Sequence, residues 1–112
     1  MGQRKAEVFQ RHEVSPREMM PGGHARFYHT DNMSLAVWEF EPGADLPSHN
    51  HPHEQITTMI EGRFKMTLDG EVVVLEKGMV VTIPPFVTHS GLALTKCHIV
   101  DVFSPVREDF LA

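Results

Sequence analysis

Short runs of strand-forming residues, separated by glycine and proline turns, dominate this chain from residue 25 onward. In residues 33–40 the large apolar side chains alternate with smaller ones until Pro42-Gly43 stops the run. Residues 64–68 alternate in the same way and lead into Asp69-Gly70, a strong hairpin signal. Further strands are expected at residues 56–60, 72–75, 79–83 and 96–103. Short strands spaced about ten residues apart indicate a β-sandwich or barrel and argue against alternating strands and helices.

The length of 112 residues, of which 41% are hydrophobic, fits one globular domain. We expect an N-terminal lead-in over residues 1–24 and a barrel domain over residues 25–112. Within the lead-in, Ser15-Pro16-Arg17-Glu18 has the spacing of a helix N-terminus. The sequence therefore predicts one short helical turn that ends at Pro21-Gly22-Gly23, with a plain loop as the alternative.

The formal charge of −5 and the absence of a Lys/Arg block argue against nucleic acid and acidic membrane surfaces as partners. No apolar run approaches the roughly 18 residues that span a bilayer, and residues 1–12 lack the apolar stretch of a signal peptide. The single cysteine, Cys97, allows no internal disulfide and fits a reducing compartment. We expect a cytoplasmic protein.

Histidines are concentrated in one segment of the chain. His49 and His51 are two residues apart, so on an extended strand their side chains point to the same side. With Gln55 just beyond and His89 delivered from another strand, they would make a four-ligand metal site. Imidazole ligands suit zinc, copper, iron and nickel. The alternative is a cluster of solvent-exposed loop histidines.

His53 has the same parity as His49 and His51 and is a further candidate ligand. Pro52 disturbs the strand between them, however. We therefore expect His53 to lie behind the ligands or at the surface.

Asp101 is the leading candidate for acid–base chemistry. Both faces of the last expected strand are largely apolar, which predicts burial on both sides. A carboxylate in such a place costs several kcal/mol unless it is paired or hydrogen-bonded, and its pKa can rise toward the range of a general acid or base. The alternative is a structural aspartate paired with Arg107 or Arg26.

Two neighbours of Asp101 complete the candidate site. Arg107 offers a planar fork for a carboxylate, although it could instead form a surface salt bridge with Glu108 or Asp109. Phe103 could form the wall of a ligand pocket or belong simply to the core.

Two stretches of the sequence resemble the motifs of the cupin family. The first motif is carried by Gly43, His49, His51, Gln55 and Gly62, and the second by Gly78, Pro84, Phe86 and His89. Gln55 stands where the usual pattern has a glutamate, and Phe86 where a glycine is common. The resemblance implies a small double-stranded β-helix, or jelly-roll barrel, with one divalent transition metal (Ni, Zn, Mn or Fe) in its mouth. Because cupins are often dimers, it also implies a homodimer.

A narrower resemblance covers nearly the whole chain. Residues 49–55, 84–89 and 101–111 look like the KdgF group of cupins, known as pectin degradation proteins. That group opens the ring of 4,5-unsaturated monouronates released by pectin or alginate lyases. The resemblance implies a small anionic sugar as substrate and favours a catalytic role for Asp101. Two alternatives remain: a metal-dependent cupin oxygenase or other isomerase, and a non-catalytic sugar-binding cupin.

The expected ligands also predict the charge of the site. Three neutral imidazoles and the neutral amide of Gln55 leave a divalent ion with about two positive charges, whereas a glutamate would leave about one. A more positive ion is a better Lewis acid and attracts a carboxylate, which fits a uronate.

Overall fold

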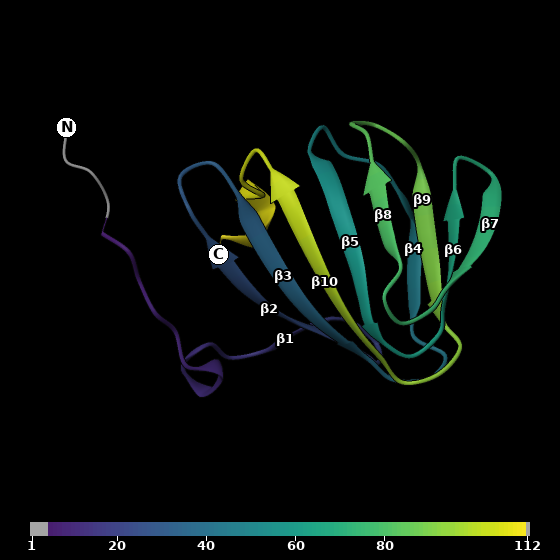
Figure 1. The fold of residues 1–112 in the computed structure, drawn as a ribbon, viewed down its shortest axis with the longest axis horizontal. Coiled ribbons are helices and arrows are strands. Elements are labelled where there is room, and N and C mark those ends of the chain that lie inside the picture. The colour runs from purple at the N-terminus through teal and green to yellow at the C-terminus, as the bar shows by residue number, and fades with distance from the viewer. Residues whose placement is uncertain (1–4, 112) are drawn as a thin grey trace.

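The computed structural model describes residues 5–111, which form two antiparallel β-sheets packed face to face (Figure 1). The six-stranded sheet has the order β1 (Arg17–Met20), β2 (Gly23–His29), β3 (Ser34–Phe40), β10 (Cys97–Ser104), β5 (Glu54–Glu61) and β8 (Val80–Ile83). The four-stranded sheet has the order β4 (Asp45–His49), β9 (His89–Ala93), β6 (Phe64–Leu68) and β7 (Glu71–Leu75). Two short 3₁₀ helices, η1 (Arg11–Glu13) and η2 (Glu108–Phe110), complete the described residues.

The core lies between the two sheets and follows from the alternation of the strands. In β3 and β10 every second residue is buried, as a strand with one face toward a core requires. Trp38 and Phe40 stack on each other with ring centroids 5.0 Å apart, and Phe40 contacts Phe64 of the opposite sheet. This arrangement is the all-β jelly-roll predicted from the sequence.

The expected strands from residue 33 onward are confirmed to within about two residues at each end, the usual uncertainty of such boundaries. The Asp69-Gly70 hairpin joins β6 to β7, and both residues have positive φ, +48° and +86°. A tight hairpin turn needs such angles, which explains the asparagine- or aspartate-glycine signal. No bounds were predicted for strands β1, β2, β4 and β9.

The predicted helical turn after Ser15-Pro16 is wrong, and so is the loop alternative. Residues 17–20 form β1, whose Arg17 lies opposite Ala25 of β2. Pairing with an existing strand edge outweighs the local capping signal, because tertiary hydrogen bonds override a weak propensity. The division at residue 24 stays a prediction, although β1 lies before it and is hydrogen-bonded into the sheet.

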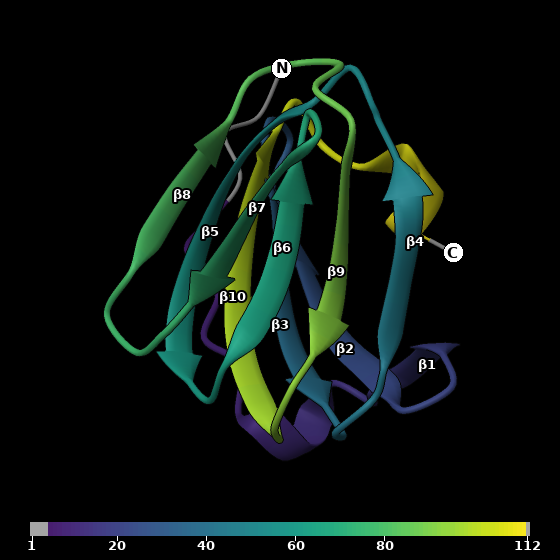
Figure 2. The same ribbon diagram turned by 90° about the vertical axis from the view of Figure 1, so that its right-hand side faces the viewer.

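Strands from both sheets bring the candidate residues to one end of the barrel. Strands β4 and β10 end there, whereas β5 and β9 begin there (Figure 2). None of the helices in residues 5–111 is long and apolar enough to cross a membrane.

Candidate metal-binding site

Three of the four predicted ligands meet at this end of the barrel. His49 is the last residue of β4, His89 is the first of β9, and the two are partners in the ladder between these strands. His51 follows in the connection to β5, so it does not share a strand with His49 as the sequence predicted. One ring nitrogen from each histidine lies within 4.8 Å of the others, close enough for all three to hold one metal ion.

Backbone carbonyls fix the orientation of all three rings. The Nδ1 atoms of His49, His51 and His89 lie 2.8, 2.9 and 2.9 Å from the carbonyl oxygens of Pro47, His53 and Val87. A carbonyl oxygen only accepts, so each Nδ1 carries the proton and donates it. The Nε2 atoms are therefore unprotonated and available, which is the usual tautomer of a metal-binding histidine.

The environment of these Nε2 atoms fits a cation. Nε2 of His89 is buried and has no hydrogen-bond partner among the described residues. Nε2 of His51 lies 3.1 Å from Oε1 of Gln55, whose amide nitrogen is directed away toward Thr57. Two acceptor atoms without a proton between them repel each other at this distance. A cation that binds both atoms would remove this repulsion.

Two of the three histidines, His51 and His89, are also held neutral. Burial, assisted by the charge of Arg107, lowers the pKa of His51 to about 4. Burial likewise lowers the pKa of His89. A metal ion therefore does not have to displace protons from these two rings at neutral pH.

Gln55 connects this cluster to Asp101. The Gln55 amide donates to the Thr57 hydroxyl at 2.9 Å, and the hydroxyl donates to Oδ1 of Asp101 at 2.6 Å. Asp101 is only 8% exposed, and burial raises its pKa to about 6 despite these hydrogen bonds. The predicted buried carboxylate with a raised pKa is therefore present. Thr57 was missed, although it lies two residues from Gln55 on the same face of β5.

The two ion pairs considered for Asp101 are not formed. Arg26 donates to the backbone oxygen of Val14, and Arg107 pairs with Asp109. This second pair is bidentate: Nε and Nη2 of Arg107 lie 3.0 and 2.7 Å from the two carboxylate oxygens of Asp109. It is the salt bridge that the sequence offered as an alternative, but Arg107 is buried, with an exposed fraction of 8%.

Aromatic rings clamp Arg107 in place. Its guanidinium carbon lies 4.7 Å from the ring centre of Phe103 and 3.9 Å from that of Phe110. Asp109 occupies the Nε–Nη2 edge, and no hydrogen bond of Nη1 occurs within the described residues. The end of the guanidinium is therefore available to a ligand.

Phe103, His53 and Phe86, which the sequence also singled out, differ in their relation to the three histidines. The Phe103 ring is buried and lies edge-on to His51, with centroids 5.7 Å apart. His53 lies outside the cluster of three and supports His51 through its backbone carbonyl. Phe86 is 65% exposed with φ of +67°, a left-handed conformation that explains why glycine is common there.

A cavity of about 340 Å³ joins these groups. Its polar lining residues are His49, Gln55, His89, Asp101 and Arg107. Its apolar lining residues are Met19, Met20, Trp38, Leu46, Pro47, Phe103 and Phe110. Met19 and Met20 belong to β1, which the sequence did not predict as a strand. A ligand in this cavity would therefore contact both polar and apolar side chains.

Comparison with known proteins agrees with this architecture. A family model described as a cupin domain matches residues 36–103, more than half of the chain. The chain therefore belongs to the cupin family, as its two motifs predicted.

Other resemblances are narrower than the family. The chain is 30% identical to pectin degradation protein KdgF of Dickeya dadantii (strain 3937) over 84 residues. This match covers 73% of this chain and 76% of that protein. The structure of KdgF from Halomonas sp. superimposes with a TM-score of 0.89 at 30% identity, over 96% of this chain and all (100%) of that one. An RmlC-like cupin from Shewanella frigidimarina gives a TM-score of 0.88 at 28% identity, over 99% and 100%. Within the cupins, the chain is KdgF-like.

Proposed function

We propose that this cupin is a metal-dependent enzyme of pectin or alginate breakdown that converts 4,5-unsaturated monouronates to linear 4-deoxy-5-keto uronates. The observation that carries the proposal is the presence of Asp101 and Arg107 in the same cavity as His49 and His89. One relative is named a pectin degradation protein, which supports this substrate class.

The proposed ligands of the ion are His49, His51, Gln55 and His89. Their free Nε2 and Oε1 atoms fit a divalent transition metal, and all four side chains are neutral. When bound, such an ion supplies Lewis-acid stabilisation of negative charge on substrate oxygens. Since no ligand carries charge, an anionic substrate is attracted to the site.

Asp101 is proposed to move one proton during ring opening. Its carboxylate takes the proton of the anomeric hydroxyl, C1 becomes a carbonyl, and the bond between C1 and the ring oxygen breaks. The electron pair of that bond passes to the ring oxygen as an enolate, and the proton returns at C4 to give the 5-keto product. The reaction is an isomerisation without oxidation or reduction. A pKa of about 6 suits a base that must also return the proton near neutral pH.

Arg107 and Phe103 are proposed to position the substrate. The available end of the Arg107 guanidinium would bind the uronate carboxylate, and the contacts with Asp109, Phe103 and Phe110 hold it in place. The ring of Phe103 would form the wall against which the sugar lies.

The test follows the absorbance of the conjugated enol of unsaturated galacturonate in the presence of purified protein. We expect loss of absorbance with metal-loaded protein, no loss after chelation, and recovery when nickel, zinc, manganese or iron(II) is returned. Binding of the uronate without loss of absorbance would instead indicate a sugar-binding cupin. Consumption of oxygen with a redox-active metal would indicate an oxygenase.

A further inference from the structure

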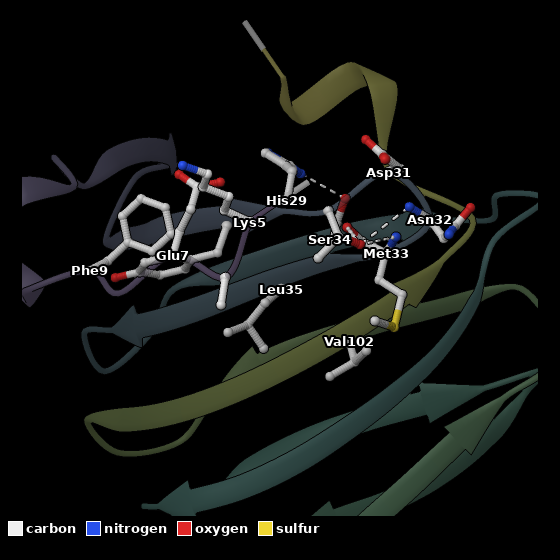
Figure 3. A pocket seen from close by; sticks show the side chains of 13 residues that line it. Lys5, Glu7, Phe9, His29, Asp31, Asn32, Met33, Ser34, Leu35 and Val102 are labelled. Atoms are coloured by element: carbon white, nitrogen blue, oxygen red, sulfur yellow. Dashed lines mark hydrogen bonds between the residues drawn. The ribbon is translucent and has the colours of Figure 1, made fainter. Parts of the chain in front are cut away.

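Strand β3 directs two side chains with hydrogen-bonding groups, Ser34 and Trp38, toward the core. The Ser34 hydroxyl lies 2.8 Å from Nδ1 of His29 (Figure 3) and accepts the backbone N–H of Arg107 at 2.8 Å. Trp38 is only 5% exposed, and its buried Nε1 has no hydrogen-bond partner within residues 5–111. A buried N–H without an acceptor destabilises a fold, so the indole of Trp38 is a candidate for a functional role.

The direction of this N–H is fixed by packing. The indole of Trp38 stacks on Phe40, with ring centroids 5.0 Å apart and an angle of 9° between the planes. Phe27 lies edge-on to the indole, at 6.3 Å and 81°. Aromatic contacts of this kind hold a ring in one orientation. Trp38 also lines the cavity that contains Asp101, so it belongs to the proposed site.

Register places the Asp101 carboxylate beside this indole. Asp101 lies opposite Ala36, two residues from Trp38 on the same face of β3. Diagonal neighbours on one face of a sheet are within reach of a long aromatic side chain. Burial raises the pKa of Asp101, and hydrogen bonding from side chains that include Trp38 lowers it. The indole N–H therefore faces the carboxylate, although the two are separated by more than a hydrogen-bond length.

We propose that Trp38 is a positioning residue for Asp101, whose carboxylate it holds by an indole N–H hydrogen bond when the site is occupied. The inference rests on the function proposed above, in which Asp101 moves a proton. An ionised carboxylate offers about four lone-pair sites on two oxygens, and the hydroxyl of Thr57 uses one of them on Oδ1. Hydrogen bonds in active sites are often long before a ligand binds and shorten in the complex, which fits the present separation.

Two donors from opposite sides would fix the carboxylate better than one. Trp38 belongs to β3 and Thr57 to β5, the two strands that flank β10. With both hydrogen bonds formed, the carboxylate of Asp101 cannot rotate without losing one of them. Orientation of this kind accelerates a step in which one group takes a proton from the anomeric hydroxyl and returns it at C4. Loss of the indole N–H should therefore affect kcat more than KM.

Nuclear magnetic resonance tests the contact without measuring activity. Trp38 is the only tryptophan, so its indole N–H gives a single resonance in the nitrogen–proton correlation spectrum of labelled protein. Asp101→Asn should shift this resonance at neutral pH, because a charged acceptor is replaced by a neutral one. Glu39→Gln is the matched control, since Glu39 adjoins Trp38 in β3 but points to the opposite face. It also removes one negative charge and should leave the resonance unchanged.

Replacement of the single tryptophan by an isostere tests the effect on the reaction. In 3-benzothienylalanine a sulfur atom takes the place of the indole N–H, and the ring keeps its shape. We expect kcat for unsaturated galacturonate to fall by about 10–100-fold, the loss of a hydrogen bond to a charged group, with KM changed by less than about twofold. Trp38→Phe should show at least the same loss. Incorporation of 5-fluorotryptophan, which keeps the N–H, should restore wild-type kinetics and so separates the hydrogen bond from the shape of the ring.

Circular dichroism and thermal unfolding establish that each protein is folded. The proposal is overturned if the indole resonance does not respond to Asp101→Asn, or if the benzothienylalanine protein retains the wild-type kcat. In the second case the proposed ring opening still stands. If wild-type protein does not open the uronate, the proposed function fails, and the resonance comparison alone decides whether Trp38 holds Asp101.

Discussion

At the scale of single residues, the site depends on hydrogen bonds that fix which atom each side chain presents. Backbone carbonyls hold the Nδ1 protons of three histidines, and Thr57 holds the amide nitrogen of Gln55. The atoms left facing the centre are therefore acceptors. A set of inward acceptors on neutral side chains is suited to a cation whose charge is kept for the substrate.

Gln55→Glu tests this charge argument. The variant should bind divalent metal at least as tightly as wild type, because the new carboxylate adds a charged ligand. It should bind an anionic uronate more weakly, because the net charge of the site falls from about two to about one. Isothermal titration with metal, and then with uronate, measures both. Tighter uronate binding would refute the electrostatic role given to Gln55.

Asp101→Asn separates proton transfer from structure. The asparagine oxygen can still accept the bond from Thr57, so the fold should survive while the proton cannot be taken up. We expect kcat to fall by about 10²–10⁴ with little change in KM. Asp45→Asn, at an exposed position of β4, is the control and should retain wild-type kinetics. Full activity in a folded Asp101→Asn protein would exclude Asp101 as the acid–base group.

Arg107→Lys should chiefly raise KM, because lysine keeps the charge but loses the planar fork. The comparison is Asp109→Asn, which weakens the existing ion pair and leaves the guanidinium in place. If Arg107 serves only to pair with Asp109, the two variants will have the same kinetic defect. A larger rise in KM for Arg107→Lys supports contact with the substrate carboxylate.

The buried carboxyl of Asp101 should also make stability depend on pH in metal-free protein. Its folded pKa of about 6 exceeds the ordinary value of 3.8, so the folded state holds the proton more tightly than the unfolded state. Its contribution is fully present below the ordinary pKa and is lost as pH rises through about 6. The free energy of unfolding should fall by about 3 kcal/mol over this range. Urea denaturation at several pH values should show that Asp101→Asn removes the dependence, and a decline of equal size in that variant would assign it to another group.

At the scale of elements, the turn between β5 and β6 depends on a close backbone approach. Gly62 has φ of +93°, and a side chain there would overlap the carbonyl oxygen of Lys96. Gly78, before β8, has a similar φ of +88° but open space around it. Both are glycines of the cupin motifs, yet only one is constrained by packing as well as by conformation.

Alanine substitution at these two glycines should therefore differ in cost. Gly78→Ala should lower stability by about 1–2 kcal/mol, the cost of left-handed backbone for a residue with a side chain. Gly62→Ala should cost more, because a backbone atom cannot move aside as a flexible side chain can. Thermal unfolding of the two variants measures the difference. Equal losses would show that the approach of Lys96 relaxes without cost.

At the scale of the whole molecule, metal binding should stabilise the fold, because the ligands come from both sheets. His49 and His89 belong to the four-stranded sheet, whereas Gln55 belongs to the six-stranded sheet. An ion that binds only the folded chain adds about 2.7 kcal/mol at a hundredfold excess over Kd, which corresponds to a rise in Tm of roughly 10–20 °C for a domain of this size.

His49→Ala should abolish most of this rise, whereas His12→Ala, in η1 and outside the cluster, should retain it. Trp38 is the single tryptophan and lines the cavity, so its fluorescence provides a second measure of nickel or copper binding. An equal metal-induced shift in both histidine variants would place the ion elsewhere.

The sequence by itself determined the fold class, most strands and the residues that could serve as ligands. Alternation and turn residues are local signals, so they can be read from the sequence alone. The His-x-His spacing also predicted correctly that two candidate ligands lie together, although only His49 lies on a strand. The burial of Asp101 on the last strand was also predictable, because both faces of that strand are largely apolar.

Only the tertiary structure decided the partners of these residues. The strand β1 exists because β2 offers an edge, and it brings Met19 and Met20 into the cavity. The pairing of Asp101 with Thr57 instead of an arginine depends on the distance between strands that are far apart in the sequence. Local patterns determine which side of a strand a residue faces, but contacts across a barrel are set by register and packing, which no single segment encodes.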